Sequence, residues 1–318
     1  MTTGSGLVGL EDIREAAEGL SGVAVRTPLL PVPALAELAG VPVFLKLENR
    51  QPTGAFKLRG AWTALRHLPD AERRRGVITY SSGNHGQAVA FAAFRLGIHA
   101  VIVMPETAPA AKVKGVRKWG GDVVFAGRTS DDRRQKAEEL IARDGLAVVP
   151  PFDHPLVIAG QGTVGLEIVE DLPEVTDVLV PVGGGGLLAG IATALAHLAP
   201  GAVATGVEPE GAAVLAASLA AGHRVRVDAT ASVADGLLPL QIGKLPWAHV
   251  HDRVRSAVVS DRAIMTAARW LRDHAGVLAE PSGAVTTAAL QSGAVRPGGP
   301  TVLVVSGGNV DPDALGPA

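Results

Sequence analysis

The chain contains no cysteine, which excludes disulfide bonds, thiolate-bound zinc and a thiol nucleophile. It also lacks an excess of charge of either sign, because 29 Lys and Arg residues are interspersed with 31 Asp and Glu residues. No basic surface for nucleic acid or an anionic membrane is therefore indicated, and a small molecule is the expected partner. Apolar stretches such as LLAGIATALAHLA are shorter than the roughly 20 residues that cross a membrane.

The N-terminal sequence MTTGSGLVGLEDIREAAEG lacks the basic segment and apolar core of a secretion signal, so we expect a cytoplasmic protein. A chain of 318 residues with 47% hydrophobic content can bury one large core or two ordinary ones. We expect two.

Short β-branched runs alternate with helical stretches along most of the chain. The runs VITY, AVIVM and DVVFA form one set, and DVLVPV, AVATGVE, SAVV and TVLVVS form a second. This alternation predicts an α/β fold with two open parallel-sheet domains. The earlier run PVFLKLE should dock with the second set. We expect residues 1–55 and 153–318 to form a large domain and residues 56–152 a small mobile one.

Ligands of open parallel sheets bind beyond the carboxyl ends of the strands, so the loops after the predicted strands are where chemistry is expected. After PVFLKLE, Lys57 opens a predicted helix directly behind Phe56. A lysine at a helix start opposes the macrodipole, which favours the neutral amine that a Schiff-base lysine needs. A solvated surface lysine is the alternative.

The loop after VITY reads SSGNHGQ and enters a helix with Ser81 or Ser82 near the cap position. Small side chains and free backbone N–H groups at a helix start suit a carboxylate. An ordinary capped turn is the alternative.

Four glycines follow DVLVPV and lead into the next helix, where backbone amides can close around an anion. The glycines do not fix the ligand. Gly184, Gly186 and Ala189 also satisfy the dinucleotide-binding pattern G-x-G-x-x-A, and Glu208 lies about where a ribose-binding acid would.

Two further polar residues stand at predicted element ends. Ser306 follows the strand TVLVV and precedes two glycines, which also fits a tight exit turn. Glu280 precedes a proline at a predicted helix start, where it could be a simple cap.

Taken in order, TGAFKLRGA, SSGNHGQA, PVGGGGLLAGIA, AEPSGA and SGGN resemble the fold-type II pyridoxal phosphate (PLP) enzymes of the threonine/serine dehydratase and serine racemase group. The resemblance covers roughly residues 25–311. It implies that PLP lies in the cleft between the two domains, as a Schiff base on the catalytic residue Lys57. The other cofactor-binding residues that it implies are Phe56, Asn84, Gly183, Gly184, Gly185, Gly186, Glu280 and Ser306.

The same resemblance implies where the substrate lies. The substrate carboxylate is expected against the loop SSGNHGQ. The implied substrate-binding residues are Ser81, Ser82, Gly83, Asn84, His85 and Gly236. Ser82 also matches the second base that a racemase needs on the face opposite the lysine. In relatives with a divalent metal, the ligand positions correspond to Glu208, Ala212 and Val214 here. Valine cannot bind a hard cation, so we expect no divalent metal and leave a monovalent cation open.

The expected reaction is the dehydration and deamination of L-threonine, L-serine or both to a 2-oxo acid and ammonia, by a homodimer. A serine beside the pyridine nitrogen holds it protonated less well than a carboxylate, which favours elimination over transamination. The alternatives are an amino-acid racemase, a dehydratase of a modified hydroxy-amino acid, a β-replacement synthase, an idle binding protein and, more distantly, an NAD-binding protein.

Overall fold

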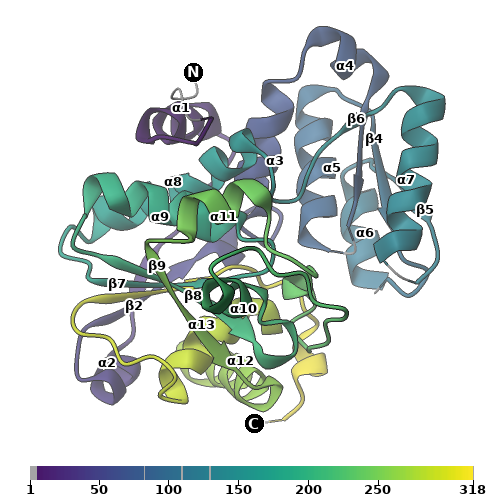
Figure 1. The fold of residues 1–318 in the computed structure, drawn as a ribbon. Coiled ribbons are helices and arrows are strands. Elements are labelled where there is room, and N and C mark those ends of the chain that lie inside the picture. Colours follow the sequence, from purple (N-terminus) through teal and green to yellow (C-terminus); the bar gives the residue numbers. More distant parts are fainter. Residues whose placement is uncertain (1–5, 82, 109, 129, 318) are drawn as a thin grey trace.

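The computed structural model describes residues 6–81, 83–108, 110–128 and 130–317, which form two sheets with helices on both faces (Figure 1). The strands of the larger sheet are β1 (Leu29–Pro31), β2 (Val43–Leu47), β7 (Asp177–Pro181), β8 (Val203–Pro209), β9 (Val254–Val259) and β10 (Thr301–Val305). Their spatial order is β1-β2-β10-β7-β8-β9. The predicted docking of PVFLKLE with the second set is confirmed, because β2 pairs with β10.

All neighbouring strands of the larger sheet run parallel except β1, which pairs antiparallel with β2. The parallel prediction is therefore wrong at this one edge. The segment Leu29–Pro31 lies between prolines, and proline in a strand is tolerated at a sheet edge, where one side needs no partner.

The smaller sheet contains β3 (Val77–Tyr80), β4 (Ala100–Met104), β5 (Asp122–Phe125) and β6 (Ala147–Val148). Their order is β5-β4-β3-β6, and every pair is parallel. The strands predicted from VITY, AVIVM and DVVF are confirmed. The two-residue strand β6 is too short to leave a pattern in the sequence.

The helices fill the connections between strands. They are α1 (Leu10–Leu20), α2 (Pro33–Ala39), α3 (Lys57–Arg66), α4 (Asp70–Arg75), α5 (Asn84–Leu96), α6 (Ala110–Lys118), α7 (Ser130–Asp144), α8 (Pro155–Asp171), α9 (Gly186–Leu198), α10 (Val214–Ala221), α11 (Lys244–Val250), α12 (Asp261–Ala275) and α13 (Pro281–Gln291). Short 3-10 helices are η1 (Glu48–Arg50), η2 (Glu210–Ala212), η3 (Asp235–Leu237) and η4 (Pro312–Leu315). None of the described helices is long and apolar enough to cross a membrane.

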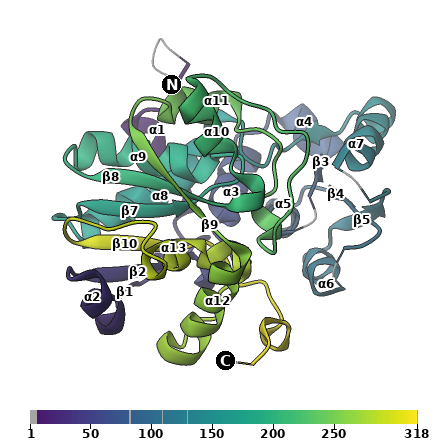
Figure 2. The same cartoon turned by 60° about the horizontal axis from the view of Figure 1, so that its bottom comes forward.

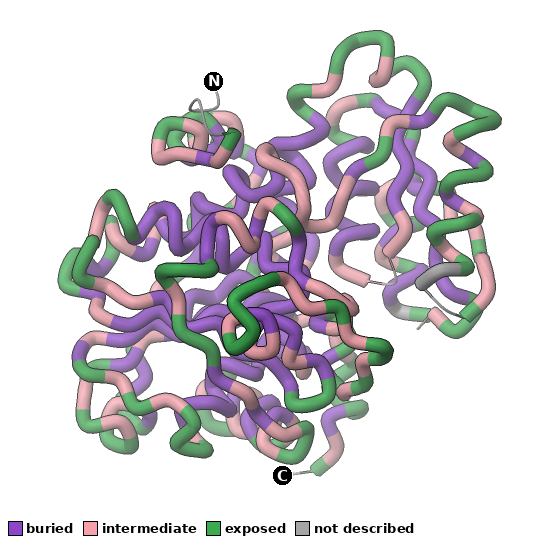
Figure 3. The backbone as a smooth tube through the Cα atoms, in the orientation of Figure 1, coloured by how far each residue is buried: buried purple, intermediate pink, exposed green. Residues whose placement is uncertain are grey.

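Alternate residues of each central strand enter different cores, as the two-residue period of a strand requires. In β10, Val302 and Val304 join the core under α1, α8 and α9, whereas Leu303 and Val305 join the core under α12 and α13. Figure 2 shows these two helical layers on opposite faces of the sheet. The smaller sheet is likewise covered on one face by α5 and on the other by α7. Figure 3 shows that the strands at the centre of each sheet are buried.

Helices α8 and α9 approach each other through glycines. A Cβ atom on Gly190 of α9 would lie 2.4 Å from the backbone nitrogen of Gly162 in α8. A Cβ on Gly162 would in turn lie 3.1 Å from the carbonyl oxygen of Gly190. Hydrogen is therefore the largest substituent that this helix crossing accepts without a shift of the backbone.

Helix α3 lies at the junction of the two sheets. Its Leu58 and Leu65 share a core with Val89 of α5 and with Leu20 and Val157 from the remainder of the chain. The strands of the smaller sheet fall between residues 77 and 148. The domain boundaries at residues 55 and 153 stay a prediction.

Candidate functional site

Loops that are far apart in the sequence meet beyond the carboxyl ends of β2, β3, β7 and β10. The backbone N–H of Phe56 donates to the carbonyl oxygen of Ser306 at 3.0 Å, and Ala55 forms an isolated bridge with Gly307. From the smaller sheet, Asn84 donates its side-chain amide to Glu280. The lysine, serine-asparagine and SGGN loops therefore line one site.

Lys57 is the first residue of α3, as predicted, and its side chain is half-buried. Its Nζ donates to the carbonyl oxygen of Pro151 at 2.7 Å and lies 5.2 Å from the centre of the Phe56 ring. Burial lowers the pKa of Lys57 from its ordinary value of 10.5 to about 8. A lysine with this pKa has a substantial neutral fraction near neutral pH, which is what attack on an aldehyde requires.

The four glycines, Gly183 to Gly186, form the turn between β7 and α9 and are all buried. Gly185 is the N-cap of α9, with φ of +89°, a conformation that side chains disfavour. A Cβ on Gly184 would lie 2.2 Å from the ring of Phe152. The turn thus presents backbone rather than side chains at the start of a helix, which suits a phosphate.

Asn84 is fixed by two partners. Its Nδ2 donates to Glu280, and its Oδ1 accepts from Nδ2 of Asn309 at 2.8 Å. Glu280 occupies the N-cap position of α13, but its side chain forms no cap hydrogen bond, so the simple-cap interpretation is wrong. Burial raises the pKa of Glu280 to about 7.

Ser306 is buried at the end of β10. Its hydroxyl donates to the carbonyl oxygen of Ser282 at 3.4 Å, which is long for an O–H donor. Gly236 of η3 lies against the same residue, since its N–H donates to Ser282 Oγ at 2.9 Å. Its carbonyl oxygen would be 3.1 Å from a Cβ on Gly183. Ser306, Gly236 and the glycine turn therefore lie next to one another.

The predicted substrate loop leads into α5, which begins at Asn84 with Gly83 as its N-cap, two residues after Ser81. The Gly83 N–H donates to Ser81 Oγ at 3.3 Å. Ser82 lies outside the described residues, and its predicted role stays a prediction.

His85 is buried, and its Nε2 donates to the carbonyl oxygen of Val149 at 3.0 Å. Within the described part of the chain its Nδ1 has no hydrogen-bond partner. Burial, reinforced by the charge of Lys57, lowers the pKa of His85 to about 3. The ring is therefore neutral at physiological pH and does not act as a general acid there.

The predicted cation position does not fit a divalent metal. Both carboxylate oxygens of Glu208 accept from backbone N–H groups at the start of α10, from Leu215 at 2.7 Å and from Ala216 at 2.9 Å. Ala212 lies in η2, where only its backbone carbonyl could be a ligand, and Val214 begins α10 with no side-chain oxygen where a carboxylate is needed. Among the described residues, no group of three or more His, Asp or Glu side chains could hold a metal. Because Glu208 is engaged here, the dinucleotide interpretation also loses its ribose-binding acid.

Sequence reasoning missed several residues of the site. Phe152 packs on Gly184, and its neighbour Pro151 accepts from Lys57, but PPFDHP is typical only of a structural break. Asn309 ends the motif SGGN, so the sequence pointed to this residue, but nothing in the sequence indicated that it bonds to Asn84. Lys112 and Asp235 form an ion pair across the site, and no sequence pattern links them.

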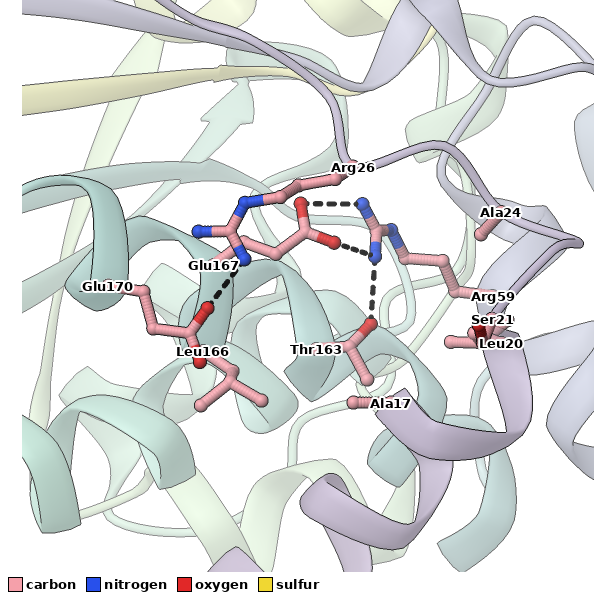
Figure 4. A pocket seen from close by; sticks show the side chains of 10 residues that line it. All are labelled: Ala17, Leu20, Ser21, Ala24, Arg26, Arg59, Thr163, Leu166, Glu167 and Glu170. Carbon is pink, nitrogen blue, oxygen red and sulfur yellow. Dashed lines mark hydrogen bonds and ion pairs between the residues drawn. The ribbon is translucent and has the colours of Figure 1, made fainter.

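A cavity of about 320 Å³ lies elsewhere, between α1, α3 and α8 (Figure 4). Arg59 points into it and is paired with Glu167 at 2.6 Å, while Arg26 is paired with Glu170 at 2.5 Å. Since its charged residues pair with one another, we interpret this cavity as part of the structural framework.

Comparison with known proteins identifies the family of the chain. Residues 20–307 match the family model described as pyridoxal-phosphate dependent enzyme. The L-threonine ammonia-lyase of Thermotoga maritima is 42% identical over 306 residues, which cover 96% of this chain and 76% of that protein. The serine racemase of Schizosaccharomyces pombe is 38% identical over 95% of this chain and 94% of its own length. The solved structure of maize serine racemase has a TM-score of 0.92 and 36% identity, covering 97% of this chain and 95% of its own.

Proposed function

The chain belongs to the family of pyridoxal-phosphate dependent enzymes, and from this premise we propose that it is an ammonia-lyase that converts L-threonine, L-serine or both to a 2-oxo acid and ammonia. The observation that carries the proposal is the placement of Lys57. The Lys57 amine, with its lowered pKa, donates to Pro151, whose neighbour Phe152 packs on the glycine turn. The residue before Lys57 is hydrogen-bonded to the backbone of Ser306, whose hydroxyl suits a ring nitrogen.

The residues present fit PLP. Lys57 would hold its aldehyde carbon as a Schiff base, the turn Gly183–Gly186 would bind its phosphate, and Ser306 would face its ring nitrogen. Phe56 and Asn84 lie at the rim of the same space and would contact the ring and its oxygen, with Glu280 supporting Asn84. When bound, PLP supplies an electron sink for the charge left on the substrate Cα when its proton is removed.

The chain's own residues then orient the substrate and move one proton. The start of α5, with Ser81, Gly83, Asn84 and His85, would bind the substrate carboxylate through backbone N–H groups. The Lys57 amine, released from the cofactor, would accept the Cα proton. The same proton, passed from the Lys57 ammonium to the β-oxygen, would let the hydroxyl leave as water, and the released enamine would take up water and hydrolyse to the 2-oxo acid and ammonia.

The test is direct. Purified protein supplied with PLP is incubated with L-serine and L-threonine separately, and pyruvate and 2-oxobutyrate are quantified. Formation of either supports the proposal, and the ratio of kcat/KM ranks the substrates, which differ by a methyl group worth about 1–3 kcal/mol in a pocket. Absence of both products, from protein that retains PLP on Lys57, contradicts it.

Racemisation is a second candidate, favoured by the similarity to serine racemases. It requires a second proton donor on the face opposite Lys57, for which Ser82 is our candidate. Chiral chromatography of the same incubations would detect D-serine. Three further expectations stay predictions: a homodimer, a cytoplasmic location and the binding of a monovalent cation in place of a divalent one.

The pH dependence of cofactor uptake follows from Lys57. Its neutral form attacks the aldehyde, and its pKa of about 8 means that the neutral fraction is about one half at pH 8 and levels off above about pH 9. We expect the rate of PLP uptake by the apoenzyme to follow that curve, measured by absorbance. For free Nα-acetyl-lysine the rate should keep rising toward pH 10, near the ordinary lysine pKa of about 10.4. If the uptake rate of the protein also keeps rising up to pH 10 without levelling off, Lys57 behaves as a solvated lysine and the prediction is contradicted.

Gly184→Ala should weaken PLP binding. The new Cβ would lie 2.2 Å from the Phe152 ring, so the turn or the ring must move. Overpacking of this kind costs about 1–3 kcal/mol, and we expect the Kd of PLP to rise about tenfold or more. Gly201→Ala is the matched control, because a Cβ there meets nothing within 4 Å. If Gly184→Ala and Gly201→Ala bind PLP with equal Kd values, the steric clash with Phe152 does not affect cofactor binding.

A further inference from the structure

Lys112 and Asp235 form an ion pair that joins the two sheets across the site. Lys112 lies in α6, which packs with the smaller sheet, and Asp235 begins η3, next to Gly236. The lysine is the more enclosed partner, since its side chain is 10% exposed and that of Asp235 is 45% exposed. An enclosed ammonium needs a counter-charge, and Asp235 supplies it.

The ion pair faces the space where the substrate is expected. Nζ of Lys112 would be 3.5 Å from a Cβ on Gly83, so the ammonium lies over the loop assigned to the substrate carboxylate. The residue after Asp235, Gly236, is anchored to Ser282 and approaches the glycine turn, so the segment that carries Asp235 lies beside the candidate cofactor site. The pKa of Glu280, raised mainly by burial, is lowered by Lys112 and raised by Asp235, which places both charges near its carboxyl group.

The ion pair bears on whether a substrate with one carboxylate or with two carboxylates binds. Backbone N–H groups at the start of α5 suffice for one carboxylate. A second carboxylate, on the substrate Cβ, would meet an ammonium already neutralised by Asp235, together with the carboxylate of Asp235 itself. An unpaired Lys112 would instead attract it, because charges a few ångströms apart interact strongly in a partly enclosed cleft.

We propose that Asp235 is a specificity-determining residue: by pairing with Lys112 it makes the site select neutral hydroxy-amino acids over those that carry a second carboxylate. The inference rests on the proposed function, since it concerns the substrates of the same site. It names a role for two residues that face each other only in the folded protein.

The experiment compares serine with 3-hydroxyaspartate, which has the same leaving group and an added carboxylate on Cβ. In Asp235→Asn, which keeps the shape and removes the charge, we expect the ratio of kcat/KM for 3-hydroxyaspartate to that for serine to rise about tenfold or more. In Lys112→Gln/Asp235→Asn, which has a neutral pair, the ratio should return to within about threefold of wild type. An unchanged ratio in Asp235→Asn, or an equal loss for both substrates, would identify a mere link between the sheets and overturn the inference.

A binding measurement separates this inference from the proposed function. L-Aspartate and L-alanine carry no leaving group, and their binding is followed by the spectrum of the PLP-bound protein. Asp235→Asn should shift the ratio of their Kd values about tenfold toward L-aspartate. If that shift occurs in a protein that deaminates neither serine nor threonine, the inference stands and the proposed function fails. If deamination is present and the Kd ratio is unchanged, the inference fails alone. Circular dichroism and thermal melting verify that each variant is folded.

Discussion

Replacing Lys57 with alanine is expected to lower kcat/KM for the preferred hydroxy-amino acid by about 10⁴-fold or more, the upper end of what a positioned acid–base group contributes. The variant loses both the anchor of the cofactor and the acceptor of the Cα proton. It should also lose the absorbance of lysine-bound PLP. In wild type, borohydride reduction should leave the cofactor on the peptide that contains Lys57, as mass spectrometry would show.

Lys244→Ala is the matched control for this prediction. Lys244 is an exposed lysine that also stands first in its helix, α11, but lies outside the site. Its kcat/KM should stay within about twofold of wild type, as is usual for surface substitutions. Residual activity above a few per cent in Lys57→Ala, or a borohydride adduct on another lysine, would show that the reactive amine has been misassigned.

Arg59→Ala should lower the free energy of unfolding by about 3–5 kcal/mol, the cost of removing one partner from a buried ion pair. Arg59 is 1% exposed and donates to Glu48 twice at 2.8 Å and to Glu167 at 2.6 Å and 3.0 Å. Burial alone would raise the pKa of Glu48, but the guanidinium outweighs it and holds this pKa below its ordinary value. Without Arg59 the enclosed Glu48 carboxylate loses its main counter-charge. Chemical denaturation measures the change.

Arg26→Ala provides the comparison within the same cavity (Figure 4). Arg26 also pairs with two carboxylates, of Glu170 and Asp171, but its side chain is 51% exposed. Water screens such pairs, and the loss should stay below about 1 kcal/mol. Adding Glu48→Gln to Arg59→Ala should recover part of the stability, because the unpaired charge disappears. Equal losses in Arg26→Ala and Arg59→Ala would mean that burial does not set the energetics here.

The parts of the fold that follow from local pattern were predictable. Runs such as AVIVM and TVLVV are continuous and β-branched because they are buried on both faces, and the loop after TVLVV contributes to the site. The glycine turn was recognisable because its backbone, with a positive φ at Gly185, requires glycine, and Lys57 was correctly predicted to open a helix.

What could not be predicted depends on contacts between distant segments. Strand β1 contains Pro31 and is held by its pairing with β2, not by its own propensity. Glu280 is the N-cap residue of α13, but its side chain accepts a hydrogen bond from Asn84, 196 residues earlier in the chain, instead of capping the helix. Lys112 and Asp235 are ordinary charged residues in the sequence, and only folding makes them partners.

The glycine crossing of α8 and α9 has a consequence for anyone who redesigns this enzyme. Gly162 and Gly190 bring two backbones together, so the helix that begins at the glycine turn is positioned by main chain rather than by exchangeable side chains. A mutagenesis library should therefore leave these glycines fixed. Diversity is better placed at Lys112 and Asp235, which interact through their side chains and can be exchanged without a change at this helix crossing.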